Sequence, residues 1–311
     1  MSVDDARRTE SAEAKRAIWD SRPVIPTEAE TRDVRRNARR TDRDAGLATE
    51  TCTLPDGRTL AYAVGGAGDG TPVVAHHGTP GSRLFASLLA DAAAAEGVRL
   101  VVPDRPGYGR SSPPPDDWTP RDWREDLATL LDAESIERAG VVGFSGGGPF
   151  ALAAAMNERV GRAALVSAVV PPADVGLVRL SRVPLAVRAL FRLSRAYASV
   201  AGPSAVVGQY TDRSVPAGVS RAVADDFREA LRQGARAVAR ENRSFGAEWP
   251  EIDRPPVPVR AWHGTRDENA PLSAVRALAN ESGVELATAE TDHLGALLDH
   301  RREALRWVGD A

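Results

Sequence analysis

From Thr49 onward, two patterns of hydrophobic and polar positions alternate along the chain. Short apolar runs typical of buried strands are separated by longer stretches in which apolar residues recur at helical spacing. Repeated alternation of this kind predicts an α/β fold with a mostly parallel sheet that helices cover on both faces. The expected strands are 49–54, 58–64, 72–77, 98–102, 140–144, 163–170, 257–263 and 284–289, and the expected helices are 84–96, 120–131, 147–157, 271–281 and 295–308.

The alternation breaks between about Pro171 and Pro256. This stretch of about 85 residues contains no clear strand, and it carries amphipathic segments at Leu177–Val200 and Arg221–Ala239 instead. A helical insertion between two strands predicts a cap over a site at the sheet edge. We therefore expect an α/β core of residues 47–170 and 257–311 with a helical cap of residues 171–256.

The first 46 residues differ from the rest because they are rich in Arg, Glu and Asp. Helices at about 4–20 and 28–40, divided by Pro23 and Pro26, fit the pattern. A solvated extension or a clip on the surface is the simpler interpretation of residues 1–46. A role in dimerisation or as a lid is the alternative.

Composition narrows the class of protein. The 40 basic and 43 acidic residues give a net charge of −3, which provides no reason to expect nucleic acid or an anionic membrane as a partner. Cys52 is the only cysteine, so neither a disulfide framework nor a Cys-rich zinc motif is expected. There is no apolar run near the ~18 residues of a membrane span, and Met1–Arg16 lacks the apolar core of a secretory signal. We expect a cytoplasmic protein, of an oligomeric state that the sequence does not indicate.

A G-x-S-x-G motif lies between an expected strand and an expected helix. Its residues are Gly143-Phe144-Ser145-Gly146-Gly147, and this context predicts a nucleophile elbow. A serine at so sharp a turn adopts a strained backbone that projects its hydroxyl above the sheet edge. Ser145 is therefore the expected nucleophile.

An acid and a histidine follow in the order that serine chemistry requires. Asp267 comes after the strand 257–263, and His293 lies in the loop before the last helix. The histidine would take the proton of the hydroxyl, and the carboxylate would orient the histidine. Other candidates for the acid are Glu268, Asp292 and Asp174; Asp292 fits a turn or capping residue better. His263 and His300 are interpreted as structural residues.

Two backbone N–H groups are expected to form an oxyanion hole. Gly146, directly after the nucleophile, provides one. The loop after the strand 72–77 provides the other, and Thr79 is the expected donor because Pro80 has no N–H. His77 is expected to anchor this loop. The turn-rich loop from Asp104 to Ser112 has an expected structural role.

The residues that contact substrate are harder to predict. Five arginines between Arg179 and Arg195 recur on one expected helix, and a solvated helix face is a simpler interpretation than a carboxylate-binding site. The candidate pocket residues are Phe144, Tyr210, Asn242, Phe245, Trp249 and Leu294.

Four motifs together resemble the α/β-hydrolase superfamily. They are the loop His77-Gly78-x-Pro80, the loop from Asp104 to Ser111, the elbow around Ser145 and the late pair Asp267 and His293. The resemblance covers residues 47–310. It implies an eight-stranded, mostly parallel sheet with a helical cap and a site that needs neither a metal nor a cofactor. Serine at position 145 sets this chain apart from the branches with an aspartate nucleophile.

Three functions are compatible with this resemblance. The first is a serine hydrolase of the esterase type that cleaves an ester, thioester or related acyl bond of a small, largely apolar molecule. The second keeps the catalytic triad but cleaves a carbon–carbon bond, or acts as a natural-product cyclase or lyase. The third is a non-catalytic ligand receptor.

Overall fold

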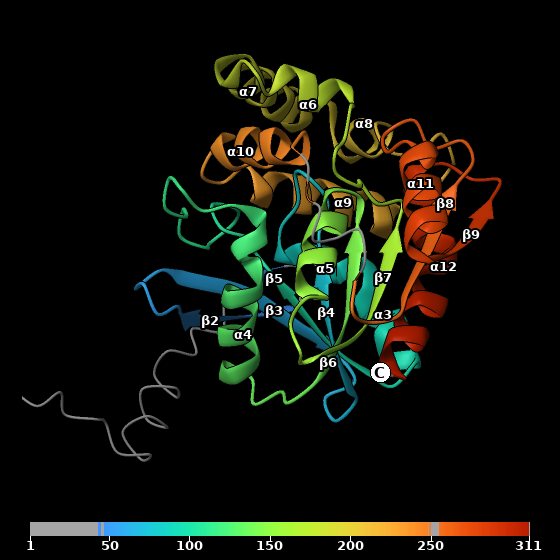
Figure 1. The fold of residues 1–311 in the computed structure, drawn as a ribbon. Helices are drawn as coiled ribbons and strands as arrows, with labels where there is room; N and C mark the ends of the chain where they lie inside the picture. The colour runs from blue at the N-terminus through green and yellow to red at the C-terminus, as the bar shows by residue number, and fades with distance from the viewer. Residues whose placement is uncertain (1–42, 45–46, 248, 250–254, 311) are drawn as a thin grey trace, which may run out of the picture. The chain divides into compact units, whose positions relative to one another are not determined.

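A computed structural model of the chain describes residues 43–44, 47–247, 249 and 255–310. These residues form a nine-stranded sheet in the order β1-β2-β3-β5-β4-β6-β7-β8-β9 (Figure 1). The six strands β5, β4, β6, β7, β8 and β9 pair in parallel with one another. The strands β1, β2 and β3 pair antiparallel, and β3 joins them to β5. The eight expected strands are present, and the mostly parallel sheet is confirmed. The strands are β1 Arg43–Asp44, β2 Leu47–Thr53, β3 Thr59–Gly66, β4 Thr71–His76, β5 Val98–Pro103, β6 Ala139–Phe144, β7 Val160–Val166, β8 Val259–Gly264 and β9 Glu285–Ala289.

The short strand β1 is an addition that the sequence pattern did not predict. The expected extension 1–46, with its helices at 4–20 and 28–40, otherwise lies outside the described residues. Strand β7 ends earlier than expected, because the backbone turns at Ser167 with a φ of 44°.

Alternating residues of the central strands pack into two separate hydrophobic cores, one on each face of the sheet. In β4, Val73 and Ala75 belong to one buried cluster, while Val74 belongs to the other. Leu89 of α3 and Leu297 of α12 pack in the first cluster. Helices α4 and α5 supply the second cluster. Both faces of the sheet are therefore covered, as the apolar strand pattern predicted. The helices that follow or precede these strands are α3 Ala86–Ala95, α4 Trp123–Ala133, α5 Gly148–Ala154, α11 Leu272–Ser282 and α12 His293–Gly309, with 3-10 turns η1 Arg83–Phe85, η2 Pro120–Asp122 and η3 Ser145–Gly147.

Among the described residues, five helices lie between β7 and β8 in the sequence, and we call them the inserted helices. Figure 1 shows α6, α7 and α10 beyond the end of the sheet toward which β7 points. The first amphipathic segment is divided into two helices at Pro184, which lacks an N–H to continue a helix. A turn with Gly234 at a φ of 88° divides the second. The inserted helices are α6 Gly176–Leu180, α7 Pro184–Ala201, α8 Pro203–Val207, α9 Ala217–Ala230 and α10 Arg236–Phe245.

Candidate active site

The backbone at Ser145 has the strained geometry expected of the elbow. Its φ is 53°, in the left-handed region that residues with a side chain rarely adopt. The residue stands between the end of β6 and the start of α5. A Cβ at Gly147 would lie 2.2 Å from the carbonyl oxygen of His76, so no side chain fits there. Local packing therefore holds the turn in the conformation that exposes the Ser145 hydroxyl.

Asp267 and His293 form a buried hydrogen-bonded pair. His293 Nδ1 lies 2.8 Å from Asp267 Oδ2, and both side chains are almost completely inaccessible to solvent. The backbone N–H groups of Asn269 and Ala270 each donate to Asp267 Oδ1 at 2.9 Å. Burial by itself would raise the pKa of Asp267, but the hydrogen bond from His293 and these contacts lower it below the ordinary value. The carboxylate stays ionised and fixes the orientation of the imidazole.

The structure corrects the expected position of His293. The residue is the first of α12, not part of the preceding loop. Asp292 is the N-cap of this helix, because its Oδ1 accepts a hydrogen bond from Gly295 N–H at 2.8 Å. Asp174, another candidate for the acid, instead forms an exposed ion pair with Arg179. Of the acids considered, Asp267 is the one that contacts the histidine.

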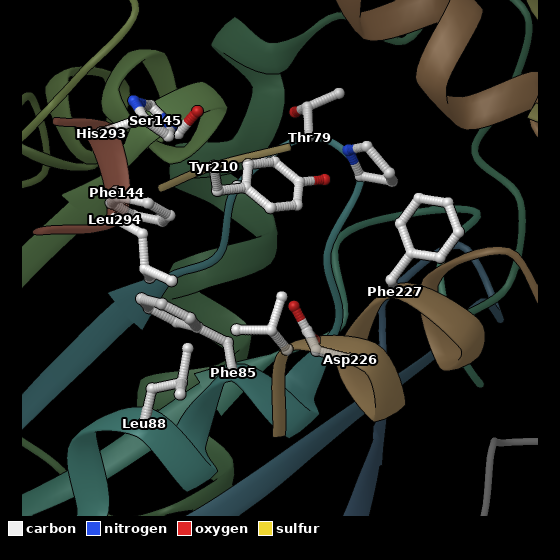
Figure 2. Close-up of a pocket in the computed structure, with 13 residues that line it drawn as sticks. Thr79, Phe85, Leu88, Phe144, Ser145, Tyr210, Asp226, Phe227, His293 and Leu294 are labelled. Carbon is white, nitrogen blue, oxygen red and sulfur yellow. The ribbon is translucent and has the colours of Figure 1, made fainter. Parts of the chain in front are cut away.

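Ser145 and His293 line the same small pocket, which Figure 2 shows from within. The cavity measures about 40 Å³, and its walls are mostly apolar. In the described part of the chain, no hydrogen bond joins Ser145 Oγ to His293, a contact that often tightens only when substrate binds. The residues that line this pocket are Gly78, Thr79, Pro80, Phe85, Leu88, Phe144, Ser145, Tyr210, Val223, Asp226, Phe227, His293 and Leu294.

The two residues expected to supply the oxyanion donors lie close together. A Cβ at Gly146 would lie 3.1 Å from the backbone nitrogen of Thr79. Neither of these N–H groups donates to another residue in the described part of the chain. His77 anchors the loop through its Nδ1, 2.8 Å from the carbonyl oxygen of Gly78. Burial lowers the pKa of His77 well below its ordinary value, so the ring is neutral.

A buried ion cluster joins this loop to the inserted helix α10. Glu241 accepts hydrogen bonds from Arg105 Nε at 2.7 Å and from Arg105 Nη2 at 2.9 Å. The same carboxylate accepts from Thr79 Oγ1 and from the Tyr108 hydroxyl, both at 2.8 Å. Arg105 also donates to Thr79 Oγ1 and to the carbonyl oxygen of Gly78. The conformation of this loop, which we call the oxyanion loop for its expected role, thus depends on a side chain more than 160 residues away in the sequence.

Three of the six candidate pocket residues lie in the pocket, and three lie elsewhere. Phe144, Tyr210 and Leu294 line it. Asn242 is buried and donates to Val238 O within α10, and Phe245 packs against Phe150 in the core. The indole of Trp249 donates to Ser244 O. The prediction is therefore wrong for the last three, whose side chains make these contacts instead of lining the pocket.

The arginines between 179 and 195 do not line this pocket either. The charged residues of this region that the sequence analysis missed are Arg105, Asp226 and Glu241. The two acids had a signal that could have revealed them: each occupies an apolar position of an amphipathic helix. Asp226 lies three residues after Val223 on α9, and Glu241 lies three residues after Val238 on α10.

Comparisons with known proteins agree with this architecture. The model of the alpha/beta hydrolase family matches residues 73–306. A non-heme chloroperoxidase of Streptomyces lividans is 32% identical over 236 residues, which cover 72% of this chain and 84% of the relative. Among solved structures, a bromoperoxidase from Bacillus anthracis has a TM-score of 0.67 at 19% identity, covering 85% of this chain and all (100%) of that chain. An enol-lactonase from Burkholderia xenovorans LB400 has a TM-score of 0.63 at 21% identity, covering 84% and 98%.

The chain therefore belongs to the alpha/beta hydrolase family, and it is an enzyme of the hydrolase class. The two structural neighbours establish the fold alone, because their identity to this chain is low. Among the described residues, none of the helices is both long enough and apolar enough to cross a membrane.

Proposed function

We propose that this protein is a serine hydrolase that cleaves an ester, thioester or related acyl bond of a small, largely apolar molecule. One observation carries the proposal: the pocket that contains the Ser145 hydroxyl is also lined by an imidazole that a buried carboxylate orients. The backbone nitrogen of Thr79 lies close to Gly146, the residue directly after this serine, which supports these two N–H groups as the oxyanion donors. This set of groups is what acyl transfer through a covalent intermediate requires.

The proposed reaction has two halves. Ser145 Oγ attacks the acyl carbon while His293 Nε2 takes its proton, and the imidazolium then protonates the leaving group. The Thr79 and Gly146 N–H groups stabilise the negative charge on the acyl oxygen. Asp267 stabilises the imidazolium through Nδ1. Water, activated by His293, then releases the acid from the acyl-enzyme. All these groups belong to the chain itself, and the mechanism uses neither a metal nor a cofactor.

The size and polarity of the pocket support a small substrate. Its volume of about 40 Å³ is well below the ~150 Å³ of an engineered apolar cavity that holds benzene. Aromatic and aliphatic side chains from Phe85, Leu88 and Phe144 form much of its wall (Figure 2). We expect acetyl and propionyl esters to be cleaved faster than long-chain esters.

Labelling with a fluorophosphonate probe tests the proposal directly. The folded protein should be labelled at Ser145, and Ser145→Ala should abolish labelling and reduce the turnover of short-chain esters about 10⁴-fold or more. Ser87→Ala is the matched control, because the Ser87 hydroxyl is buried, lies outside this pocket and forms no hydrogen bond with a described residue. It should keep full labelling and activity.

Other outcomes would favour the alternatives. Full activity in Ser145→Ala with none in His293→Ala would indicate carbon–carbon cleavage, or a cyclase or lyase reaction in which the histidine acts alone as base. Stoichiometric binding of an ester with no turnover across the whole panel would indicate a ligand receptor.

A further inference from the structure

Asp226 places a carboxyl group in the mostly apolar wall of the pocket. The residue belongs to α9 and lines the pocket together with Val223 and Phe227 of the same helix. Figure 2 shows its side chain directed into the pocket, on the other side from Ser145. None of the steps proposed above uses it. A carboxyl group in such a place needs an explanation, because an apolar environment disfavours its ionised form.

Only one of the two carboxyl oxygens has protein partners in the described part of the chain. Asp226 Oδ1 accepts from Ser82 N–H at 2.7 Å and from Ser82 Oγ at 2.6 Å. Asp226 Oδ2 forms no hydrogen bond with a described residue. One acceptor atom is therefore held in place by Ser82, and the other is available to a molecule in the pocket.

The neighbouring cations are committed to other acids. Arg83 Nη1 pairs with Asp104 Oδ2 at 3.0 Å and with Glu229 Oε1 at 2.7 Å. The guanidinium of Arg105 is paired with Glu241. Within the described residues, Asp226 itself forms no ion pair. Burial raises the pKa of Asp226 to about 7, although the Ser82 hydrogen bonds oppose this shift. The group is thus partly ionised near neutral pH and lacks a counter-ion of its own.

We propose that Asp226 selects substrates that carry a hydrogen-bond donor, a hydroxyl or an ammonium group, at the end that enters this pocket. This inference rests on the proposed function, and it names the substrate class of the same site. The apolar walls bind the short carbon skeleton, and Oδ2 accepts the hydrogen bond of its polar end. A purely structural role, in which Asp226 only ties α9 to Ser82, is the alternative.

Isosteric esters separate these two roles. In the first pair, ethyl butanoate is compared with ethyl 3-hydroxypropanoate, so that a terminal methyl group of the acyl part becomes a hydroxyl. In the second pair, propyl acetate is compared with 2-hydroxyethyl acetate, which makes the same change in the alcohol part. In a third pair, ethyl 3-aminopropanoate is compared with ethyl butanoate, so that an ammonium group replaces the terminal methyl group. The ratio of kcat/KM within each pair is the measurement, because it cancels general effects of a variant on catalysis.

Asp226→Leu should lower the hydroxyl-to-methyl ratio of at least one pair about tenfold or more, since a hydrogen bond to a charged group contributes that much binding. Asp226→Asn keeps an acceptor for Ser82 and a polar group for the hydroxyl. Its hydroxyl ratio should stay within about threefold of wild type, while its ammonium ratio should fall about tenfold or more. Asp225→Asn is the matched control, because the neighbouring Asp225 forms an exposed pair with Arg228 outside this pocket. All its ratios should remain those of the wild type.

Ratios in Asp226→Leu that equal those of the wild type in both pairs would overturn the inference and favour the structural role. In that result, the methyl-ended esters would still be hydrolysed, and the proposed function would stand. If no ester is hydrolysed, the proposed function fails, and binding decides the inference. Calorimetry would then compare ethyl 3-hydroxypropanoate with ethyl butanoate in Ser145→Ala and in Ser145→Ala/Asp226→Leu. Equal affinities for both esters in both proteins would overturn it.

Discussion

Glutamine in place of Glu241 tests how strongly the buried ion cluster controls the oxyanion loop. The side chain is 3% exposed, and four hydrogen bonds converge on its carboxylate. An amide at this position keeps a similar shape but loses the charge, and its NH₂ group must face at least one donor of Arg105. The guanidinium, which is fully buried, would then be left without its counter-ion.

The expected cost follows from this burial. Removing one partner of a buried ion pair destabilises a protein by about 3–5 kcal/mol. We expect Glu241→Gln to lower the free energy of unfolding by an amount in this range. We also expect kcat to fall, because a neutral amide replaces the charged acceptor that holds the Thr79 side chain at 2.8 Å, and the strained cluster holds the loop less firmly. The upper limit is the complete loss of one oxyanion donor, a factor of about 10²–10³ in kcat.

Urea unfolding and ester hydrolysis measure the two effects. The kcat of Glu241→Gln should fall about tenfold or more, with KM changed by less than about threefold, because the oxyanion contact strengthens mainly in the transition state. Arg243→Gln is the control, since this exposed residue of the same helix also loses one charge. Its free energy of unfolding should change by no more than about 0.5 kcal/mol. A loss in Glu241→Gln no larger than in this control, together with an unchanged kcat, would refute the reasoning.

Two further predictions concern the pocket. In Gly146→Ala, the new Cβ would lie 2.2 Å from Thr79 Oγ1 and 2.7 Å from Thr79 Cβ, so the oxyanion loop must move; steady-state kinetics should show kcat reduced about 10²–10³-fold, and a wild-type kcat would contradict the assigned donors. The pKa of Asp226 in the folded protein, about 7, exceeds the ordinary aspartate value of 3.8, so ionisation of this group destabilises the fold increasingly as pH rises through this interval. Asp226→Asn should therefore gain stability relative to wild type at pH 8 compared with pH 5 in thermal unfolding, and an equal difference at both pH values would count against the raised pKa.

The central strands were predictable because their burial is visible in the sequence. A strand covered on both faces needs an uninterrupted apolar run, as in residues 73–75 of β4. The elbow was predictable for a related reason. Its geometry depends on local backbone sterics: a Cβ at Gly143 would lie 2.5 Å from the carbonyl oxygen of Gly147, and the left-handed φ at Ser145 is characteristic of this turn.

The positions at which the inserted helices begin and end were harder to predict from the sequence. Amphipathic periodicity indicated helices between β7 and β8, but a periodic pattern does not show where a helix stops. Pro184 and the turn at Gly234 ended helices within stretches that we expected to be continuous. The first turn of α12 was missed for a similar reason, since its start depends on the Asp292 side chain capping the helix.

The sequence by itself determined the type of fold, the order of the candidate nucleophile, acid and base, and the identity of the loop that faces the nucleophile. These properties depend on periodicity and on short-range backbone geometry, which neighbouring residues dictate. Only the tertiary structure decided that Glu241 holds the oxyanion loop and that Asp226 enters the pocket. A charged residue on the apolar side of a helix is stable only if distant segments supply its partners, and those partners become neighbours only when the chain is folded.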